Sequence, residues 1–215
     1  MNAGSPDGRV RLIADDLVSI AAADPADAQR TAEHLRNERW VEVVPGLDSV
    51  VVQFDNAAMS AAEAVRLASA GQGSARARIA PSAGTRTLHV RYGGDDGPDL
   101  DELCRRLGLS RAEFLERHTS ADYRVDMLGF TPGFAYLGGL DPGLDAPRLR
   151  TPRQRVPAGS VGVAGGRTGI YALPGPGGWS LVGRVVERLF DAAADEPFLL
   201  SPGMHVRLVA VPDSR

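Results

Sequence analysis

The sequence contains no lysine, so all 24 of its basic side chains are arginines. Without lysine, a P-loop nucleotide site, a Schiff base and a lysine general base are all excluded. Acidic side chains slightly outnumber the arginines, which leaves a formal net charge of -3. The arginines are scattered along the chain and form no positive stripe, so we expect no nucleic-acid partner.

Cysteine is also scarce, because Cys104 is the single one. One cysteine excludes an internal disulfide and a thiolate metal cluster, and no other spacing typical of zinc ligands occurs. Cys104 shares helical spacing with Leu100, Leu103 and Leu107, which is typical of a small buried hydrophobe. The sequence therefore predicts no metal site on this chain.

Long hydrophobic runs are missing as well. No apolar run approaches the roughly 18 residues of a membrane span. No basic start followed by an apolar segment marks a secretory signal. We therefore expect a cytoplasmic protein that makes no contact with a membrane.

Glycine and proline, in contrast, are concentrated between Gly129 and Gly183. This stretch holds 14 of the 25 glycines and 7 of the 15 prolines. Each glycine costs about 1 kcal/mol and each proline about 3 kcal/mol in a helix interior, which excludes a long helix. Apolar side chains are interleaved throughout, which argues against disorder. The stretch predicts short strands joined by tight turns, and we interpret it as a binding surface.

The first part of the chain predicts two helices among short strands. Asp24 and Pro25 suit the N-cap and first position of one helix, while Ser60 and Glu63 form a capping box for another that would end at Gly71. The β-rich runs are Val10–Ile20, expected as a strand or a hairpin, Trp40–Val44 and Ser49–Phe54. The order strand, helix, strand, strand, helix is that of a ferredoxin-like α/β sandwich.

A small, polar, glycine-bearing segment, Gln72–Thr85, has the composition of a linker. We therefore predict an N-terminal α/β domain with its linker over residues 1–85 and a second domain over residues 86–215. The expected strands of the second domain begin with the run from Arg86 and end with Val185–Phe190, Pro197–Leu200 and Met204–Val211. With helices only near its start, this domain should be a β-barrel or a sandwich, giving an α+β protein.

Two helices are expected early in the second domain. Pro98–Leu107 is amphipathic, and the next helix begins with a capping box of Ser110 and Glu113. His118 falls in the last turn of that helix, where the helix dipole favours the protonated form. His118 is a candidate general acid or base, although a histidine at a helix end is more often a cap or a surface group.

Arginines give another candidate group. Arg153 and Arg155 are two residues apart, and on an extended segment they would point to one face and clamp a carboxylate or phosphate. The alternative is a solvated charged edge that prevents sheet aggregation. Ser160, Thr168 and Tyr171 carry hydroxyls among glycines whose N–H groups could bind an anion, or they could simply bond their own turns. Trp179 is either a binding platform or a core anchor.

Several motifs together resemble the allophanate hydrolase subunit 1 family, also called the kinase-inhibitor family or the family of the 5-oxoprolinase B subunit. The matching motifs are YGG at Tyr92, GPDL at Gly97, His118 before Thr119, GFTPGFAYLGGLD from Gly129, TPRQRVPAGSVGVAGGRTGIY from Thr151, and PGGWSLVGR. The match covers nearly the whole second domain. It implies a cyclophilin-like β-barrel, similar to half of the carboxyltransferase module of biotin-dependent urea carboxylase.

The resemblance also implies a function. Family members act with a homologous partner subunit, called 2 or C, and with a third subunit as an ATP-dependent 5-oxoprolinase, which converts 5-oxo-L-proline to L-glutamate. ATP, with Mg, would serve the assembled complex, and no biotin would be carried here because lysine is absent. The alternatives are an interaction module that inhibits a sensor histidine kinase, and a carboxyltransferase or allophanate hydrolase type of subunit for urea-like substrates.

In the 5-oxoprolinase interpretation, His118, Arg153 and Arg155 are the expected catalytic residues. The residues expected to bind a small anionic substrate are Tyr92, Phe130, Pro132, Gly133, Phe134, Ser160, Arg167, Thr168 and Trp179. This chain departs from the family pattern where Arg167 replaces a glutamine and Ala172 replaces a proline. A neutral amide thereby becomes a fixed cation that only donates hydrogen bonds.

Overall fold

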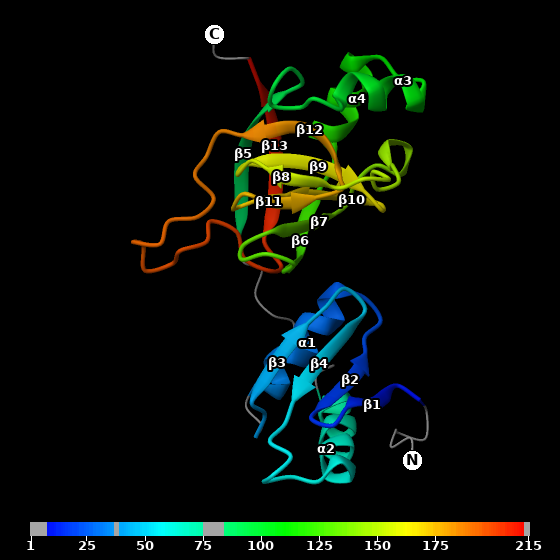
Figure 1. Ribbon diagram of the computed structural model, residues 1–215, viewed down its shortest axis with the longest axis vertical. Coiled ribbons are helices and arrows are strands. Elements are labelled where there is room, and N and C mark those ends of the chain that lie inside the picture. Colours follow the sequence, from blue (N-terminus) through cyan, green and yellow to red (C-terminus); the bar gives the residue numbers. More distant parts are fainter. Residues whose placement is uncertain (1–7, 37–38, 75–83, 213–215) are drawn as a thin grey trace. The chain divides into compact units, whose positions relative to one another are not determined.

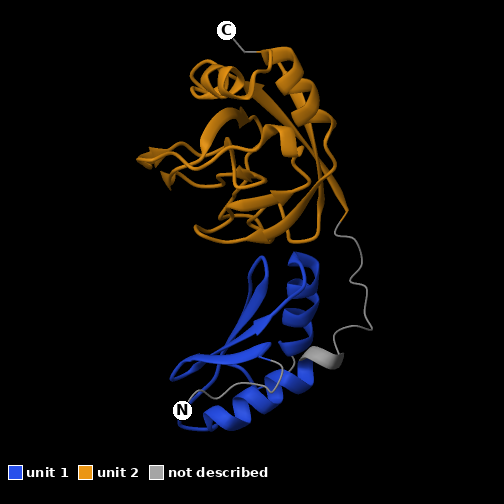
Figure 2. Cartoon of the chain, turned by 90° about the vertical axis from the view of Figure 1, so that its right-hand side faces the viewer, with its two compact units in different colours: residues 1–81 blue, residues 82–215 orange. Residues whose placement is uncertain are grey.

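The computed structural model describes residues 8–36, 39–74 and 84–212. Its contacts divide the chain into two compact units, residues 1–81 and 82–215 (Figure 2). The predicted linker falls largely on residues 75–83, outside the described residues. No helix among the described residues is long and apolar enough to cross a membrane.

The first unit is a four-stranded antiparallel sheet with two helices (Figure 1). Its elements are β1 (Val10–Ala14), β2 (Leu17–Ala21), α1 (Pro25–Leu35), β3 (Glu42–Pro45), β4 (Ser49–Gln53) and α2 (Ala61–Ser74). The sheet order is β1-β2-β4-β3. Strands β2, β4 and β3 with the two helices form the predicted ferredoxin-like arrangement, and β1 supplies the edge strand that would otherwise follow α2.

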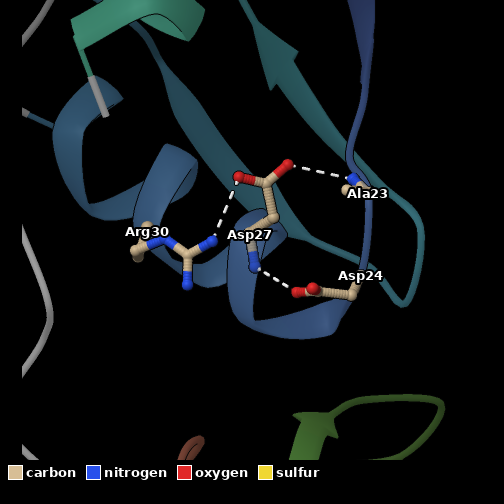
Figure 3. A network of polar contacts seen from close by, with 4 residues as sticks. All are labelled: Ala23, Asp24, Asp27 and Arg30. Carbon is tan, nitrogen blue, oxygen red and sulfur yellow. Dashed lines mark hydrogen bonds and ion pairs between the residues drawn. The ribbon is translucent and has the colours of Figure 1, made fainter. Parts of the chain in front are cut away.

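Helix α1 begins at the residues that the sequence indicates (Figure 3). Asp24 caps the helix by accepting a 2.7 Å hydrogen bond from the Asp27 backbone N–H. Asp27 accepts in return from the Ala23 N–H at 2.9 Å and from Arg30 at 3.3 Å. Free N–H groups at the helix start are thereby satisfied.

Helix α2 does not end at Gly71, so that prediction is wrong: the helix continues to Ser74. A Cβ atom built on Gly71 would come within 2.6 Å of Leu35 Cδ2 in α1. The glycine therefore permits close packing between the helices, and the favourable packing offsets its poor helix propensity.

The second unit is a closed barrel of seven strands, as expected for its β-rich sequence. The barrel order is β10-β7-β6-β13-β5-β12-β9, and a separate two-stranded ribbon pairs β8 with β11. The strands are β5 (Thr85–Tyr92), β6 (Tyr123–Leu128), β7 (Ala135–Gly138), β8 (Arg153–Val156), β9 (Ser160–Ala164), β10 (Arg167–Ile170), β11 (Gly175–Gly177), β12 (Ser180–Val185) and β13 (His205–Val211). Strands β5 and β13 pair in parallel along all of β13.

Helices α3 (Leu100–Leu107) and α4 (Arg111–Ser120) follow β5. Gly108 ends α3 with a φ of 68°, in the left-handed region that glycine adopts readily. The predicted capping box is present, because Ser110 accepts from the Glu113 N–H while the Glu113 side chain accepts from the Ser110 N–H. Phe114 and His118 form the buried face of α4.

Two predicted strands are wrong. Strand β12 ends at Val185, and the segments Val185–Phe190 and Pro197–Leu200 are joined only by one isolated bridge between Phe190 and Phe198. Their apolar content serves packing instead, because Leu189 and Leu200 are buried in the barrel core. A short apolar run does not by itself distinguish a strand from a buried loop.

Candidate functional site

The barrel wall separates the predicted site residues into an inner and an outer group. Side chains along a strand alternate between the two faces of a sheet. On β9 and β10, Val163 and Ile170 belong to the barrel core, and Thr168 shares the face of Ile170. The outward positions include Gly162 and Gly169, where a built Cβ atom would come within 2.8 Å of Trp179.

The inner group is a chain of buried hydrogen bonds around His118. His118 Nδ1 lies 2.7 Å from the Tyr92 hydroxyl, and Nε2 lies 3.0 Å from Thr168 Oγ1. The Tyr123 hydroxyl donates to the His118 carbonyl oxygen at 3.0 Å. The chain connects β5, α4, β6 and β10 inside the barrel.

The tautomer of His118 couples the two hydrogen bonds of its ring. A neutral imidazole protonated at Nε2 donates to Thr168 and accepts from Tyr92 at Nδ1, and the other tautomer reverses both directions.

Burial lowers the pKa of His118 to about 3. The expectation that the helix end protonates His118 is therefore wrong, because loss of hydration outweighs the attraction of the helix dipole. The side chain has no exposed surface, and both ring nitrogens are already hydrogen-bonded. Its predicted role in acid–base catalysis stays a prediction, and the geometry favours a role in positioning the strands.

The outer group is an aromatic cluster on the other side of the wall. Phe134 is at its centre, with ring centroids 4.7 Å from those of Tyr136 and Tyr171 and 5.7 Å from that of Trp179. The contacts are edge-to-face, an arrangement that aromatic rings prefer. Arg148 lies over Trp179, with Cζ 6.0 Å from the ring centroid. Trp179 is thus largely a core anchor, with a cation above it.

The β8–β11 ribbon carries Arg153, whose Nη2 donates a 2.6 Å hydrogen bond to Asp99 Oδ1. The other carboxylate oxygen of Asp99 accepts from the Leu181 N–H at 2.7 Å. Arg155 is exposed to solvent. The two arginines thus have different surroundings. Arg153 pairs with Gly177 and Val156 with Gly175, so β8 has one more residue than β11 between these two pairs. This bulge interrupts the regular alternation of side chains from which a common face for Arg153 and Arg155 was predicted.

The loop between β6 and β7 contains a strained aromatic residue. Phe130 has a φ of 71°, a conformation that is unfavourable for a bulky side chain, and it is 63% exposed. It contacts the outer cluster through Phe134, at a centroid distance of 5.8 Å. Pro132 is exposed and Gly133 is half-buried beside it. Strain of this kind is often found at functional sites.

Ser160 lies in an outward row of the barrel wall. It is opposite Arg184 on β12, and on the other side its carbonyl oxygen accepts from the Tyr171 N–H. Its hydroxyl is buried and, among the described residues, has no hydrogen-bond partner. Arg184 pairs with Asp96 at 2.9 Å, and Asp96 also accepts from Arg91 at 2.6 Å.

Arg167 does not present an uncompensated charge. Its Nε lies 3.2 Å from Asp126 Oδ2 on β6. A carboxylate therefore accompanies the cation that replaces the glutamine of the family pattern. Within residues 8–36, 39–74 and 84–212, no cluster of three histidine, cysteine or acidic side chains is arranged to hold a metal ion.

Residues 9–200 match the family model for the carboxyltransferase domain, subdomain C and D. The chain belongs to this family. It is 43% identical over 169 residues to the 5-oxoprolinase B subunit of Escherichia coli O157:H7, covering 79% of this chain and 77% of that protein. It is 45% identical over 124 residues to the 5-oxoprolinase B subunit of Bacillus subtilis, of which it spans about half, 52%.

A solved structure also resembles this member of the carboxyltransferase subdomain C and D family. It is that of a conserved uncharacterized protein from Pyrococcus horikoshii, with 34% sequence identity and a TM-score of 0.58. The match covers 99% of this chain and 98% of the other. The arrangement of strands and helices is therefore shared over almost the full length of both proteins.

In this family member, the structure brings some predicted residues together and separates others. Tyr92, His118 and Thr168 are inside the barrel, whereas Phe134, Trp179 and Arg153 are outside it. Asp99 and Asp126, which pair with predicted arginines, were not among the residues predicted from the sequence. An acidic residue paired with a distant arginine leaves no periodic signal, so only the GPDL motif marked the position of Asp99.

Proposed function

We propose that this chain is a subunit of an ATP-dependent 5-oxoprolinase and acts with a homologous partner subunit. The complex would convert 5-oxo-L-proline, ATP and water to L-glutamate, ADP and phosphate. The observation that carries the proposal is the 43% identity to the Escherichia coli protein, which extends over more than three quarters of both chains. A small anionic substrate also suits the arginines on the outer face of the barrel.

The chemistry needs stabilisation of negative charge more than a protein nucleophile. An unstrained lactam resists hydrolysis, and transfer of a phosphoryl group to its amide oxygen makes the carbon open to attack by water. Fixed hydrogen-bond donors that face the developing charge lower this barrier. Arg153, held by Asp99, is a donor of this kind. ATP and Mg would be bound where the partner subunits complete the site.

The remaining predicted residues receive two roles in this proposal. Phe130, Pro132, Gly133 and Ser160 surround the outer cluster and contribute to substrate binding together with Arg155 and Arg167. Tyr92, His118 and Thr168 support the wall from inside, directly behind the strands that carry Gly162 and Gly169. A shift of this wall would displace Phe134 and Trp179, so the inner chain positions the outer face.

The test is reconstitution of the complex. We expect the chain, co-expressed with its homologous partner and third subunit, to hydrolyse ATP faster when 5-oxoproline is added. The chain alone should show no such stimulation, and neither should a complex that lacks this chain. An assembled complex whose ATP hydrolysis does not respond to the lactam would reject the proposal.

A second candidate function is inhibition of a sensor histidine kinase by direct binding. The exposed Phe130 favours it, because a bulky apolar side chain held in a strained conformation on the surface suits a protein partner. In that case a purified sensor kinase should lose autophosphorylation when the chain is added, and Phe130→Ser should restore it. Unchanged autophosphorylation at a molar excess of the chain would exclude this candidate for the kinase tested.

A further inference from the structure

The β8–β11 ribbon lies directly over the hydroxyl group of Tyr171. Arg153 pairs with Gly177 across the ribbon. A Cβ atom built on Gly177 would overlap the Tyr171 hydroxyl and lie 2.9 Å from Val156 Cγ2. The end of the tyrosine side chain is therefore beneath the Arg153–Gly177 pair, on the outer face of the barrel.

The guanidinium of Arg153 uses only part of its hydrogen-bonding capacity. Nη2 donates to Asp99, whose position is fixed by the Leu181 N–H. Nη1 is buried and, among the described residues, has no hydrogen-bond partner. A buried donor on a charged group is unfavourable when it is left without an acceptor. The ion pair with Asp99 thus holds Arg153 in a position that leaves one donor group unused.

Tyr171 adds a second donor near Arg153, because its hydroxyl lies against Gly177, the residue that pairs with Arg153. Burial raises the pKa of Tyr171 to about 12, and nearby Arg148 and Arg153 only partly oppose this effect. The hydroxyl therefore keeps its proton at neutral pH. A phenol O–H and a guanidinium N–H are both donors, so the group that would satisfy them is an acceptor. Because one of the donors is charged, an anionic oxygen is the best match.

Other unsatisfied polar atoms surround the ribbon. Thr131 Oγ1 and Ser160 Oγ are buried without partners within the described residues. Thr131 approaches Gly175 of β11, and Ser160 is the backbone neighbour of Tyr171. Most buried polar groups in native proteins are hydrogen-bonded, so unpaired hydroxyls on the segments next to Gly175 and Tyr171 are consistent with a ligand on this part of the outer face.

We propose that Tyr171 Oη and Arg153 Nη1 form a binding subsite for a carboxylate or phosphoryl oxygen beneath the β8–β11 ribbon, and that Asp99 is the positioning residue for Arg153. The inference deepens the proposed function, since the carboxylate of 5-oxoproline and the phosphoryl group of ATP both have this chemistry. It adds Tyr171 to the proposed substrate contacts. It also gives Asp99 an indirect role, because Asp99 holds Arg153 in place without contacting the ligand.

The test uses the reconstituted complex with two variants that change few atoms. Tyr171→Phe removes only the hydroxyl and keeps the ring in the aromatic cluster, while Asp99→Asn removes the charge and keeps an acceptor for Leu181. We expect each to raise the KM for one substrate by about tenfold or more, with kcat changed by less than about threefold. Asp101→Asn, at an exposed position on α3, is the matched control and should retain wild-type values.

The substrate whose KM rises identifies the ligand. A higher KM for 5-oxoproline assigns the subsite to the carboxylate, and a higher KM for ATP assigns it to a phosphoryl group. If both folded variants keep both KM values, the inference is wrong even though the proposed function stands.

Binding to the full chain separates the inference from the enzyme assay. Calorimetric titration with 5-oxoproline and with inorganic phosphate should show weaker binding to Tyr171→Phe and Asp99→Asn than to the wild type. This result would support the subsite even if the complex had no lactam-dependent activity. No binding of either probe to the wild type, or equal binding to all variants, would overturn it.

Discussion

The free energy of unfolding is expected to fall by about 1.4 kcal/mol for each pH unit below about pH 6.5, through His118 alone. The folded protein holds this side chain neutral, with a pKa of about 3, whereas an unfolded histidine titrates near 6.5. Protons therefore bind preferentially to the unfolded state, and stability present above pH 6.5 is lost as the pH falls towards 3. Over the full window the loss is about 4–5 kcal/mol.

Denaturant unfolding between pH 7 and pH 5 measures this slope with little interference from carboxyl groups. His118→Gln should be less stable at pH 7, because it loses the buried hydrogen bonds, but its stability should depend much less on pH. An undiminished slope in His118→Gln would show that another group causes the acid sensitivity.

Gly97→Ala is expected to destabilise the second unit by about 3 kcal/mol or more. A Cβ atom at this position would overlap the Val182 carbonyl carbon and oxygen and lie 2.7 Å from the Gly93 nitrogen. These are backbone atoms of β12 and of the turn after β5, so they cannot move aside as the tip of a side chain can. The segment that carries Asp96 and Asp99 would have to separate from β12.

The effect should therefore appear in stability and in function together. Urea unfolding would give the loss of free energy, and the reconstituted complex should lose substrate affinity because Asp99 no longer supports Arg153. Gly129→Ala is the control for stability, since its nearest neighbour would be Met127 Cε at 3.5 Å, an ordinary contact. A Gly97→Ala variant as stable as the wild type would show that the loop can relax without cost.

The parts of the fold with local signals were predictable from the sequence. The capping box at Ser110 and the N-cap at Asp24 are read from neighbouring residues, and both helices begin there. Closely spaced strands and turns left a barrel and a sandwich open, and the family resemblance indicated the barrel. The continuation of α2 past Gly71 was not predictable, because the close packing of Gly71 against Leu35 is a tertiary contact that no neighbouring residue reports.

The candidate site was predictable as a set of residues but not as a geometry. His118 and Arg153 are 35 residues apart in the sequence, and nothing in this spacing shows that His118 lies inside the barrel and Arg153 outside it. The Arg153–Asp99 pair joins residues 54 apart. Strand β8 also contains a bulge between Arg153 and Val156, and the sequence contains no mark of that bulge.

The parallel pairing of β5 with β13 has a consequence for biogenesis. The first and last strands of the second unit are neighbours along all of β13, from His205 to Val211. On the ribosome, β5 therefore remains without β13 until nearly the whole unit has been translated, whereas the paired strands of the first unit are separated by no more than the distance from Leu17 to Gln53 along the chain. Such long-range closure slows folding, so the first unit should become protease-resistant in nascent chains before the second.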